Sequence, residues 1–149
     1  MQIMMGCDPE IFIRDTLTGS IISGEGIVPG TKRHPHKVEC GALQLDGLAL
    51  EFNIDPVDNE KDWIKHITVV LGECKDILPK NTELAFLPSV QFDKKTFATF
   101  SPKSLELGCD PDYNAISGER NPVPQDPGHM RTASGHIHIG FVDKRRFFR

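Results

Sequence analysis

The chain has 149 residues, of which 38% are hydrophobic and 26% charged, and its formal net charge at pH 7 is -4. A chain of this length buries about 70% of the surface that its unfolded form exposes, so we expect residues 1–149 to form a single domain that needs no disulfides. The negative charge argues against nucleic acid as a partner, because a phosphate backbone favours clustered Lys and Arg.

The sequence carries no signal for a membrane. No stretch approaches the roughly 20 apolar residues of a membrane span, and Met1 to Cys7 lacks the basic start of a signal peptide. The cysteines, at positions 7, 40, 74 and 109, include no Cys-x-x-Cys pair, so no zinc knuckle is predicted. We therefore expect a cytoplasmic protein with reduced, mostly buried cysteines and no membrane partner.

The first strand is predicted over Asp8 to Arg14, where residues alternate between two faces. One face carries Asp8, Glu10, Phe12 and Arg14, and the other Ile11 and Ile13. Pro9 belongs at the strand start or on an edge. A turn over Thr16 to Gly19 and a short returning strand over Ser20 to Ser23 follow. The loop Gly24 to Glu39, rich in Gly, Pro and basic residues, is either a binding element or a solvated flap.

The clearest structural signal is Ala42 to Asn53, where two alternating runs flank Asp46-Gly47. We predict a two-residue hairpin turn at Asp46-Gly47, because both residues tolerate positive φ. This turn would pair Leu45 with Leu48 and Leu43 with Leu50 on an all-leucine face. The opposite face would carry Ala42, Gln44, Ala49, Glu51 and Asn53 as the floor of a site.

The period changes to that of a helix from Asp58 to Leu78, and Pro79 ends it. We expect its apolar stripe to cover the leucine face; the stripe is Trp63, Ile64, Ile67, Val70, Leu71, Cys74, Ile77 and Leu78. Strands are predicted over Glu83 to Phe92, interrupted at Pro88, and over Thr96 to Phe100. Ser101-Pro102 predicts a brief helix through Leu105. The proline-rich segment Asp110 to Met130 is expected to be irregular and to form one wall of the site.

A strand with two different faces is predicted from Gly135 to Phe141. We expect Ile137, Ile139 and Phe141 to point into a core, and His136, His138 and Gly140 to point the other way. Imidazoles at this spacing lie roughly 6 to 7 Å apart at their roots and can converge on one cation or one anionic ligand. A pair of solvent-facing histidines on an edge strand is the alternative.

The polar faces of these three segments are candidates for one concave floor. They comprise Asp8 and Glu10, then Gln44, Glu51 and Asn53, and finally His136 and His138. Carboxylates with nearby amide oxygens suit Mg²⁺ or Mn²⁺, whereas two histidines with one carboxylate also form a common zinc set. Spacing in the sequence leaves these metals open.

Four segments carry a resemblance to a known family. They are Gly6 to Glu10, Gln44 to Ile54, Gly108 to Ala115, and Arg131 to Gly140. In this order they resemble the phage-encoded carboxylate-amine ligases of type 2, which belong to the glutamine-synthetase-like amidoligases. We therefore expect an α+β fold like that of glutamine-synthetase-like catalytic domains. It would have a mainly antiparallel sheet with one long helix packed on one face.

The resemblance implies an ATP-dependent ligase. A small-molecule or peptide carboxylate would become an acyl phosphate, and an amine would then displace phosphate to give an amide. The implied metal ligands for Mg²⁺ or Mn²⁺ are Glu10, Glu51, His136 and His138. Asp8 and Asn53 would support the metal ligands Glu10 and Glu51. The implied nucleotide-binding residues are Asn53, Arg131 and His136, and the implied catalytic residues are Arg131 and His138. An ordinary salt bridge is the alternative role for Arg131.

Two features depart from the family pattern. Ser134 stands where a second glycine is expected, and Arg149 follows the histidine strand directly, where such domains continue. We therefore expect a fold that is incomplete at its C-terminus, or a chain that pairs with a partner such as another copy of itself. A short echo of Gly6 to Glu10 at Gly108 to Asp112 is as consistent with chance or a shared turn as with duplication.

Two other functions stay open. One is a non-catalytic metal- or ligand-binding module, or a phage structural component, that kept the sheet. The other is a zinc-dependent hydrolase that uses His136, His138 and Glu51 with a bound water.

Overall fold

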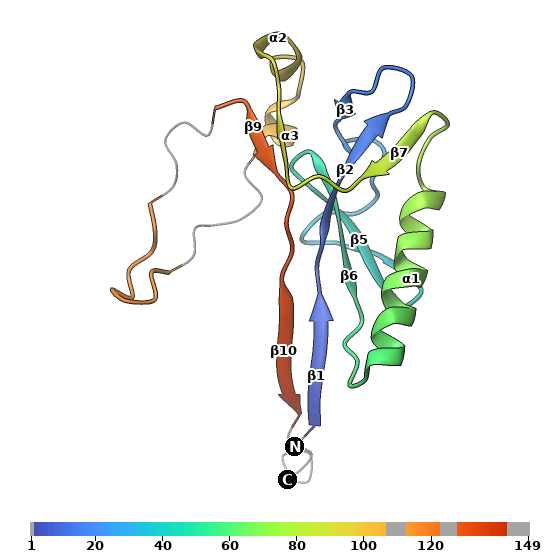
Figure 1. Ribbon diagram of the computed structural model, residues 1–149, viewed down its shortest axis with the longest axis vertical. Helices are drawn as coiled ribbons and strands as arrows, with labels where there is room; N and C mark the ends of the chain where they lie inside the picture. The colour runs from blue at the N-terminus through green and yellow to red at the C-terminus, as the bar shows by residue number, and fades with distance from the viewer. Residues whose placement is uncertain (1, 107–112, 123–127, 143–149) are drawn as a thin grey trace.

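The computed structural model of the chain describes residues 2–106, 113–122 and 128–142 (Figure 1). The strands are β1 (Gln2–Cys7), β2 (Glu10–Asp15), β3 (Ile21–Ile22), β4 (His36–Val38), β5 (Gly41–Asp46), β6 (Ala49–Ile54), β7 (Thr82–Ala85), β8 (Ser89–Gln91), β9 (Met130–Thr132) and β10 (Ile137–Val142). The helices are α1 (Glu60–Asp76), α2 (Lys94–Phe97) and α3 (Pro102–Leu105). These strands pair antiparallel and α1 is the long helix, which confirms the predicted α+β class.

The main sheet has six strands, in the order β3-β2-β6-β5-β4 with β7 paired to β2. β2 begins directly after Pro9, as expected for a residue that cannot donate to a ladder. The first residues of β2 pair with β6, where Glu10 lies opposite Glu51, and the later ones pair with β3 and β7. The start of β2 therefore brings a carboxylate against the β5–β6 hairpin.

The hairpin forms as predicted, but its turn lies one residue later. Gly47 and Leu48 are its central residues, and Asp46 pairs with Ala49. Gly47 has a φ of 53°. A glycine with positive φ at the first central position gives a turn whose twist matches that of the flanking strands. Gly47 rather than Asp46 therefore takes that position.

The predicted leucine pairs are consequently wrong. Leu45 pairs with Leu50, Leu43 with Phe52, and Gln44 with Glu51. The shift moves each partner by two residues, and only a shift by one would turn the side chains to the other face. The polar floor of the hairpin therefore keeps its predicted members.

Helix α1 packs on the apolar face of the hairpin, on the right of Figure 1. It begins after Asn59, whose side chain accepts a hydrogen bond from the Asp62 amide at 3.0 Å and so caps the first turn. The buried cluster between helix and hairpin includes Leu43, Leu50, Phe52, Val70 and Cys74. Ile64 was expected in the stripe but is 56% exposed.

A second cluster covers the tip of the hairpin on the opposite face. Its buried members are Phe12, Ile21, Leu48, Ala49, Ala85, Phe92 and Ala133. The predicted strand over Glu83 to Phe92 is divided into β7 and β8 around Pro88, as expected. The strand predicted over Thr96 to Phe100 is wrong, because the Asp93 side chain accepts hydrogen bonds from two amides and starts helix α2. Helix α3 and its Ser101 cap are confirmed.

β1 and β10 form a separate two-stranded ribbon in the lower half of Figure 1. The predicted strand is confirmed, but the expected core contact of its apolar face is wrong. Ile137, Ile139 and Phe141 are 71%, 63% and 62% exposed, and Ile3, the partner of Phe141, is 50% exposed. His138 and Gly140, on the other face of β10, line the cavity beside the hairpin, whereas Ile137, Ile139 and Phe141 do not.

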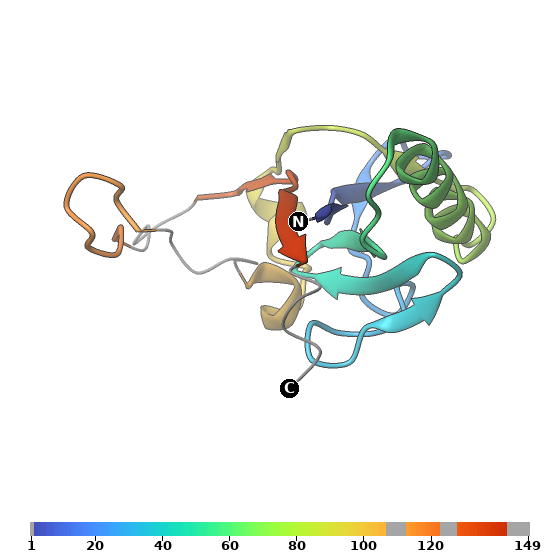
Figure 2. The same cartoon turned by 90° about the horizontal axis from the view of Figure 1, so that it is seen from below.

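The two predicted loop regions lie in different places. Residues 24–39 contain β4 and lie on β5, whereas residues 113–122 are exposed and extend away from the sheet in Figures 1 and 2. Residues 113–122 do not form the predicted wall of the site, and residues 107–112 and 123–127, with the repeated motif and Cys109, lie outside the described residues.

Cys7 and Cys74 are buried free thiols, and Cys40 is partly buried. None of the helices in the described ranges has the length and apolar character of a membrane span.

We predict that Leu50→Ala lowers the free energy of unfolding by about 2 to 5 kcal/mol, because it leaves a cavity between the hairpin and α1. Leu50 is 0% exposed. Urea denaturation measures the loss. Ile64→Ala on the exposed side of α1 is the control, with an expected change within about 0.5 kcal/mol. Equal losses in the two variants would contradict the assigned packing face of the helix.

Candidate functional site

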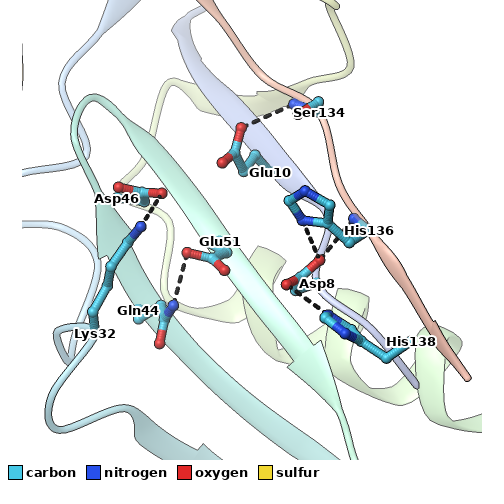
Figure 3. Close-up of polar contacts among 9 residues, drawn as sticks. All are labelled: Asp8, Glu10, Lys32, Gln44, Asp46, Glu51, Ser134, His136 and His138. Atoms are coloured by element: carbon cyan, nitrogen blue, oxygen red, sulfur yellow. Dashed lines mark hydrogen bonds and ion pairs between the residues drawn. The ribbon is translucent and has the colours of Figure 1, made fainter. Parts of the chain in front are cut away.

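The polar face of the hairpin and the histidine face of the ribbon look toward each other across a cavity of about 460 Å³. Figure 3 shows the side chains of Asp8, Glu10, Glu51, His136 and His138 on neighbouring segments of this region. The polar residues that line the cavity are Asp8, Gln44, Glu51, Asn53 and His138. The structure therefore brings five residues of the predicted floor to one cavity, whereas Glu10 and His136, which were predicted for the same floor, do not line it.

Asp8 binds both histidines. Its Oδ2 lies 3.0 Å from His138 Nε2 and its Oδ1 3.3 Å from His136 Nδ1, and Oδ1 also accepts a hydrogen bond from the His136 amide at 2.7 Å. Burial raises the pKa of Asp8, but the hydrogen bonds and the neighbouring imidazoles outweigh burial and hold this pKa below its ordinary value. An ionised carboxylate can only accept, so a neutral His138 carries its hydrogen on Nε2 and keeps its lone pair on Nδ1.

Glu10 and Glu51 lie directly opposite each other on β2 and β6. Side chains at such positions share a face, with Cβ atoms about 4.5 to 5.5 Å apart. The Ser134 amide donates to Glu10 Oε2 at 2.9 Å, and Gln44 Nε2 donates to Glu51 Oε2 at 2.7 Å. Burial nevertheless raises the pKa of both glutamates, and the negative charge of Asp46 raises it further. A cation between them would therefore be stabilised.

Lys32 and Asp46 complete the polar patch (Figure 3). Lys32 Nζ lies 2.8 Å from Asp46 Oδ2, and the Asp46 side chain is only 6% exposed. The lysine charge lowers the pKa of Glu10 and of Glu51, by less than burial raises it. The sequence does not indicate this ion pair, because the Asp-Gly pattern is typical of a turn and nothing in residues 24–39 shows that they fold onto β5.

Arg131 is not brought to the cavity, although sequence analysis predicts it as a catalytic and phosphate-binding residue. Its guanidinium donates hydrogen bonds to the carbonyls of Met130 at 2.8 Å and Leu105 at 3.0 Å, and lies 4.6 Å from the centre of the Phe97 ring. The residue is 9% exposed. Arg131 therefore holds α2 and α3 against β9. Asn53, by contrast, lies where predicted, on the cavity wall.

The site consists of two adjacent sets of groups: Asp8 with its histidines, and Glu10 with Glu51. In the described part of the chain, no three His, Cys, Asp or Glu side chains are grouped so that they could hold a metal ion together. Scans of known protein families, of curated proteins and of solved structures found no match to this chain. The geometry and charge of the two sets are therefore the basis for a function.

We predict that His138→Ala raises the pKa of Asp8, because it removes a hydrogen bond that stabilises the carboxylate. NMR titration of the Asp8 carboxyl carbon measures the change, and His36→Ala on exposed β4 is the control. The folded pKa of Asp8 is lowered, so its stabilising contribution is present above the ordinary pKa of Asp and is lost as the pH falls through the lowered value. His138→Ala should therefore destabilise the protein at neutral pH but not once Asp8 is protonated. An unchanged titration would contradict the contact.

Proposed function

We propose that this chain is an ATP- and metal-dependent carboxylate-amine ligase with a glutamine-synthetase-like fold, which forms an amide through an acyl phosphate. The observation that carries the proposal is the position of Glu10 opposite Glu51 on one face of the sheet, beside Asp8 and its two histidines. These are side chains that the resemblance to the type 2 carboxylate-amine ligases assigns to the metal and the nucleotide.

Two facing carboxylates, Glu10 and Glu51, would suit a hard divalent cation. Four carboxylates gather in this region, namely Asp8, Glu10, Asp46 and Glu51, and the positive charge of Lys32 offsets them only in part. Mg²⁺ commonly keeps several waters and takes one or two carboxylates together with substrate phosphates, so it needs few converging protein ligands. Glu10 and Glu51 would hold Mg²⁺ or Mn²⁺ in this way. When bound with ATP, the ion would neutralise charge on the γ-phosphoryl group.

The proposed reaction has two steps. A carboxylate oxygen bonds to the γ-phosphorus of ATP as the bond to ADP breaks, and an amine nitrogen then bonds to the acyl carbon as phosphate and a proton leave. Positioning of charge is the main contribution of the protein to such transfers. Gln44 and the Ser134 amide provide it by holding Glu51 and Glu10 through hydrogen bonds of 2.7 and 2.9 Å.

His138 is the residue that we assign to the proton lost by the amine. Asp8 accepts the hydrogen on Nε2, so the lone pair on Nδ1 is left to take a proton. The imidazole lines the cavity, and the ionised Asp8 would stabilise the imidazolium that forms. An imidazole oriented by a carboxylate is a common general base.

A module that binds a cation without catalysis is the second candidate, because Asp8 already engages both imidazoles. Zinc-dependent hydrolysis is a third. Zinc requires imidazole nitrogens about 2.0 to 2.1 Å from the metal, and Asp8 already holds one nitrogen of each histidine. Metal analysis of protein purified without added metal separates this case, since stoichiometric zinc would favour the hydrolase.

We predict that ATP with Mg²⁺ stabilises the protein against heat and that Glu51→Ala abolishes this effect while keeping the fold. A ligand at 100 times its dissociation constant contributes about 2.7 kcal/mol to the folded state. Differential scanning calorimetry with and without ATP and Mg²⁺ measures the effect, and circular dichroism checks the fold. Glu39→Ala, which changes an exposed glutamate outside the cavity, is the control. Stabilisation that survives Glu51→Ala would contradict the assigned ligand, and its absence from the unmutated protein would favour the non-catalytic module.

We predict that Mg²⁺ with ATP binds more weakly as the pH falls through the raised pKa values of Glu10 and Glu51, because protons compete for the same oxygens. Binding should also release protons. Calorimetric titrations in buffers of different ionisation enthalpy measure this release. Glu51→Gln should reduce it, and equal release from this variant and from the unmutated protein would exclude Glu51 as the linked group.

A further inference from the structure

The cavity between ribbon and hairpin has two chemically different ends. On the ribbon, the pair of Gly6 and His138 lies next to Asp8, and the pair of Met4 and Gly140 follows farther along the same face. Glu51 and Asn53 line the cavity on the hairpin side, and Pro56 lines it beyond them along the chain. Glu10 and Lys32 do not line it. The cavity therefore offers more than a place for a cation at the two glutamates.

The polar end presents acceptors. Gln44 Nε2 donates to Glu51 Oε2, which leaves Gln44 Oε1 and Glu51 Oε1 without a hydrogen-bond partner in the described part of the chain. The Asn53 side chain likewise makes no hydrogen bond with the described residues, and its oxygen can turn toward the same space. These acceptors suit a group that only donates, and an ammonium has three N–H donors in one position.

The charge of the lining points the same way. Of the described residues around the cavity, Asp8 and Glu51 are acidic and none is Lys or Arg. A cationic group that leaves water for this cavity is therefore matched by opposite charge, whereas an anionic group is not.

The apolar end is open because glycine occupies the ribbon there. Gly140 lies opposite Met4, and Gly6 lies opposite His138, on the face of the ribbon that lines the cavity. A Cβ atom built at Gly140 would meet no atom within 4 Å. The flexible Met4 side chain beside this gap can adapt its shape to an apolar group.

We infer that the cavity binds a primary amine that carries an apolar substituent, with the ammonium among Glu51, Gln44 and Asn53 and the substituent between Met4 and Gly140. The role of this ligand as the second substrate rests on the proposed ligase function, but its binding does not. An alkylamine is protonated at neutral pH, as lysine is. It would therefore bind as a cation.

Methionine methyl NMR tests this inference directly, with hexylamine as the probe and without nucleotide or divalent metal. We expect hexylamine to shift the methyl resonances of Met4 and Met5, assigned with Met4→Leu and Met5→Leu. Met130, which is 48% exposed on β9, should stay unchanged. Removing a buried methylene from the probe should weaken binding roughly fourfold, the effect of its transfer from water.

Two comparisons separate charge from shape. Hexanol has the same chain without the charge and should bind at least tenfold more weakly than hexylamine, and Glu51→Gln should remove most of this preference. Gly140→Val should block hexylamine by filling the apolar end. Ile139→Val, a change on the outward face of the same strand, is the matched control and should leave binding intact.

The outcomes are distinct. Equal binding of hexanol and hexylamine would overturn the amine assignment, since it would show an apolar cavity only. Absence of Met4 shifts, or shifts that persist in Gly140→Val, would overturn the location. Calorimetry with ATP and Mg²⁺ on the same protein then separates the two proposals: nucleotide binding without amine binding refutes this inference alone, and amine binding without nucleotide binding refutes the ligase alone.

Discussion

The site depends on the backbone pairing around Pro9 and Glu10, where the ribbon joins the main sheet. On one side the Phe52 amide donates to the Pro9 carbonyl at 3.1 Å, and on the other the Glu10 amide donates to the Ser134 carbonyl at 2.7 Å. This short stretch therefore holds the hairpin on one edge and the histidine segment on the other. Side chains alternate along a strand, so a shift of one residue at either edge would turn that edge's groups away from the site.

The two sets of polar groups have opposite electrostatic character. Burial and neighbouring negative charge raise the pKa of Glu10 and Glu51, whereas the histidine contacts lower that of Asp8. The glutamates consequently favour a proton or a cation, and Asp8 stays ionised beside its imidazoles. Sites that transfer protons often hold carboxyl groups in environments that shift their pKa values in opposite directions. The leucine face under α1 stabilises the sheet that carries this unfavourable concentration of charge.

Local patterns in the sequence predicted several elements because their causes are local. The 3.6-residue period and the Asn59 cap define α1, and the Ser101 cap defines α3. The same local signals misplaced the hairpin turn, where Gly47 and not Asp46 takes the first central position. The prediction for Arg131 failed for a different reason. A guanidinium suits a phosphate, but this one donates to carbonyls of α3 and β9 and stacks on the Phe97 ring.

By itself, the sequence determined which side chains share a face, because alternation along a strand needs no knowledge of its neighbours. Gln44, Glu51 and Asn53 therefore stay together even though the hairpin register differs from the prediction. Only the tertiary structure decided which face borders the cavity. In β10 it is the face of His138 and Gly140, although the His138 side chain is still 65% exposed, and Ile137 and Ile139 lie on the other face. Contacts such as Lys32 with Asp46, and the burial that shifts the glutamate pKa values, likewise arise only when distant segments meet.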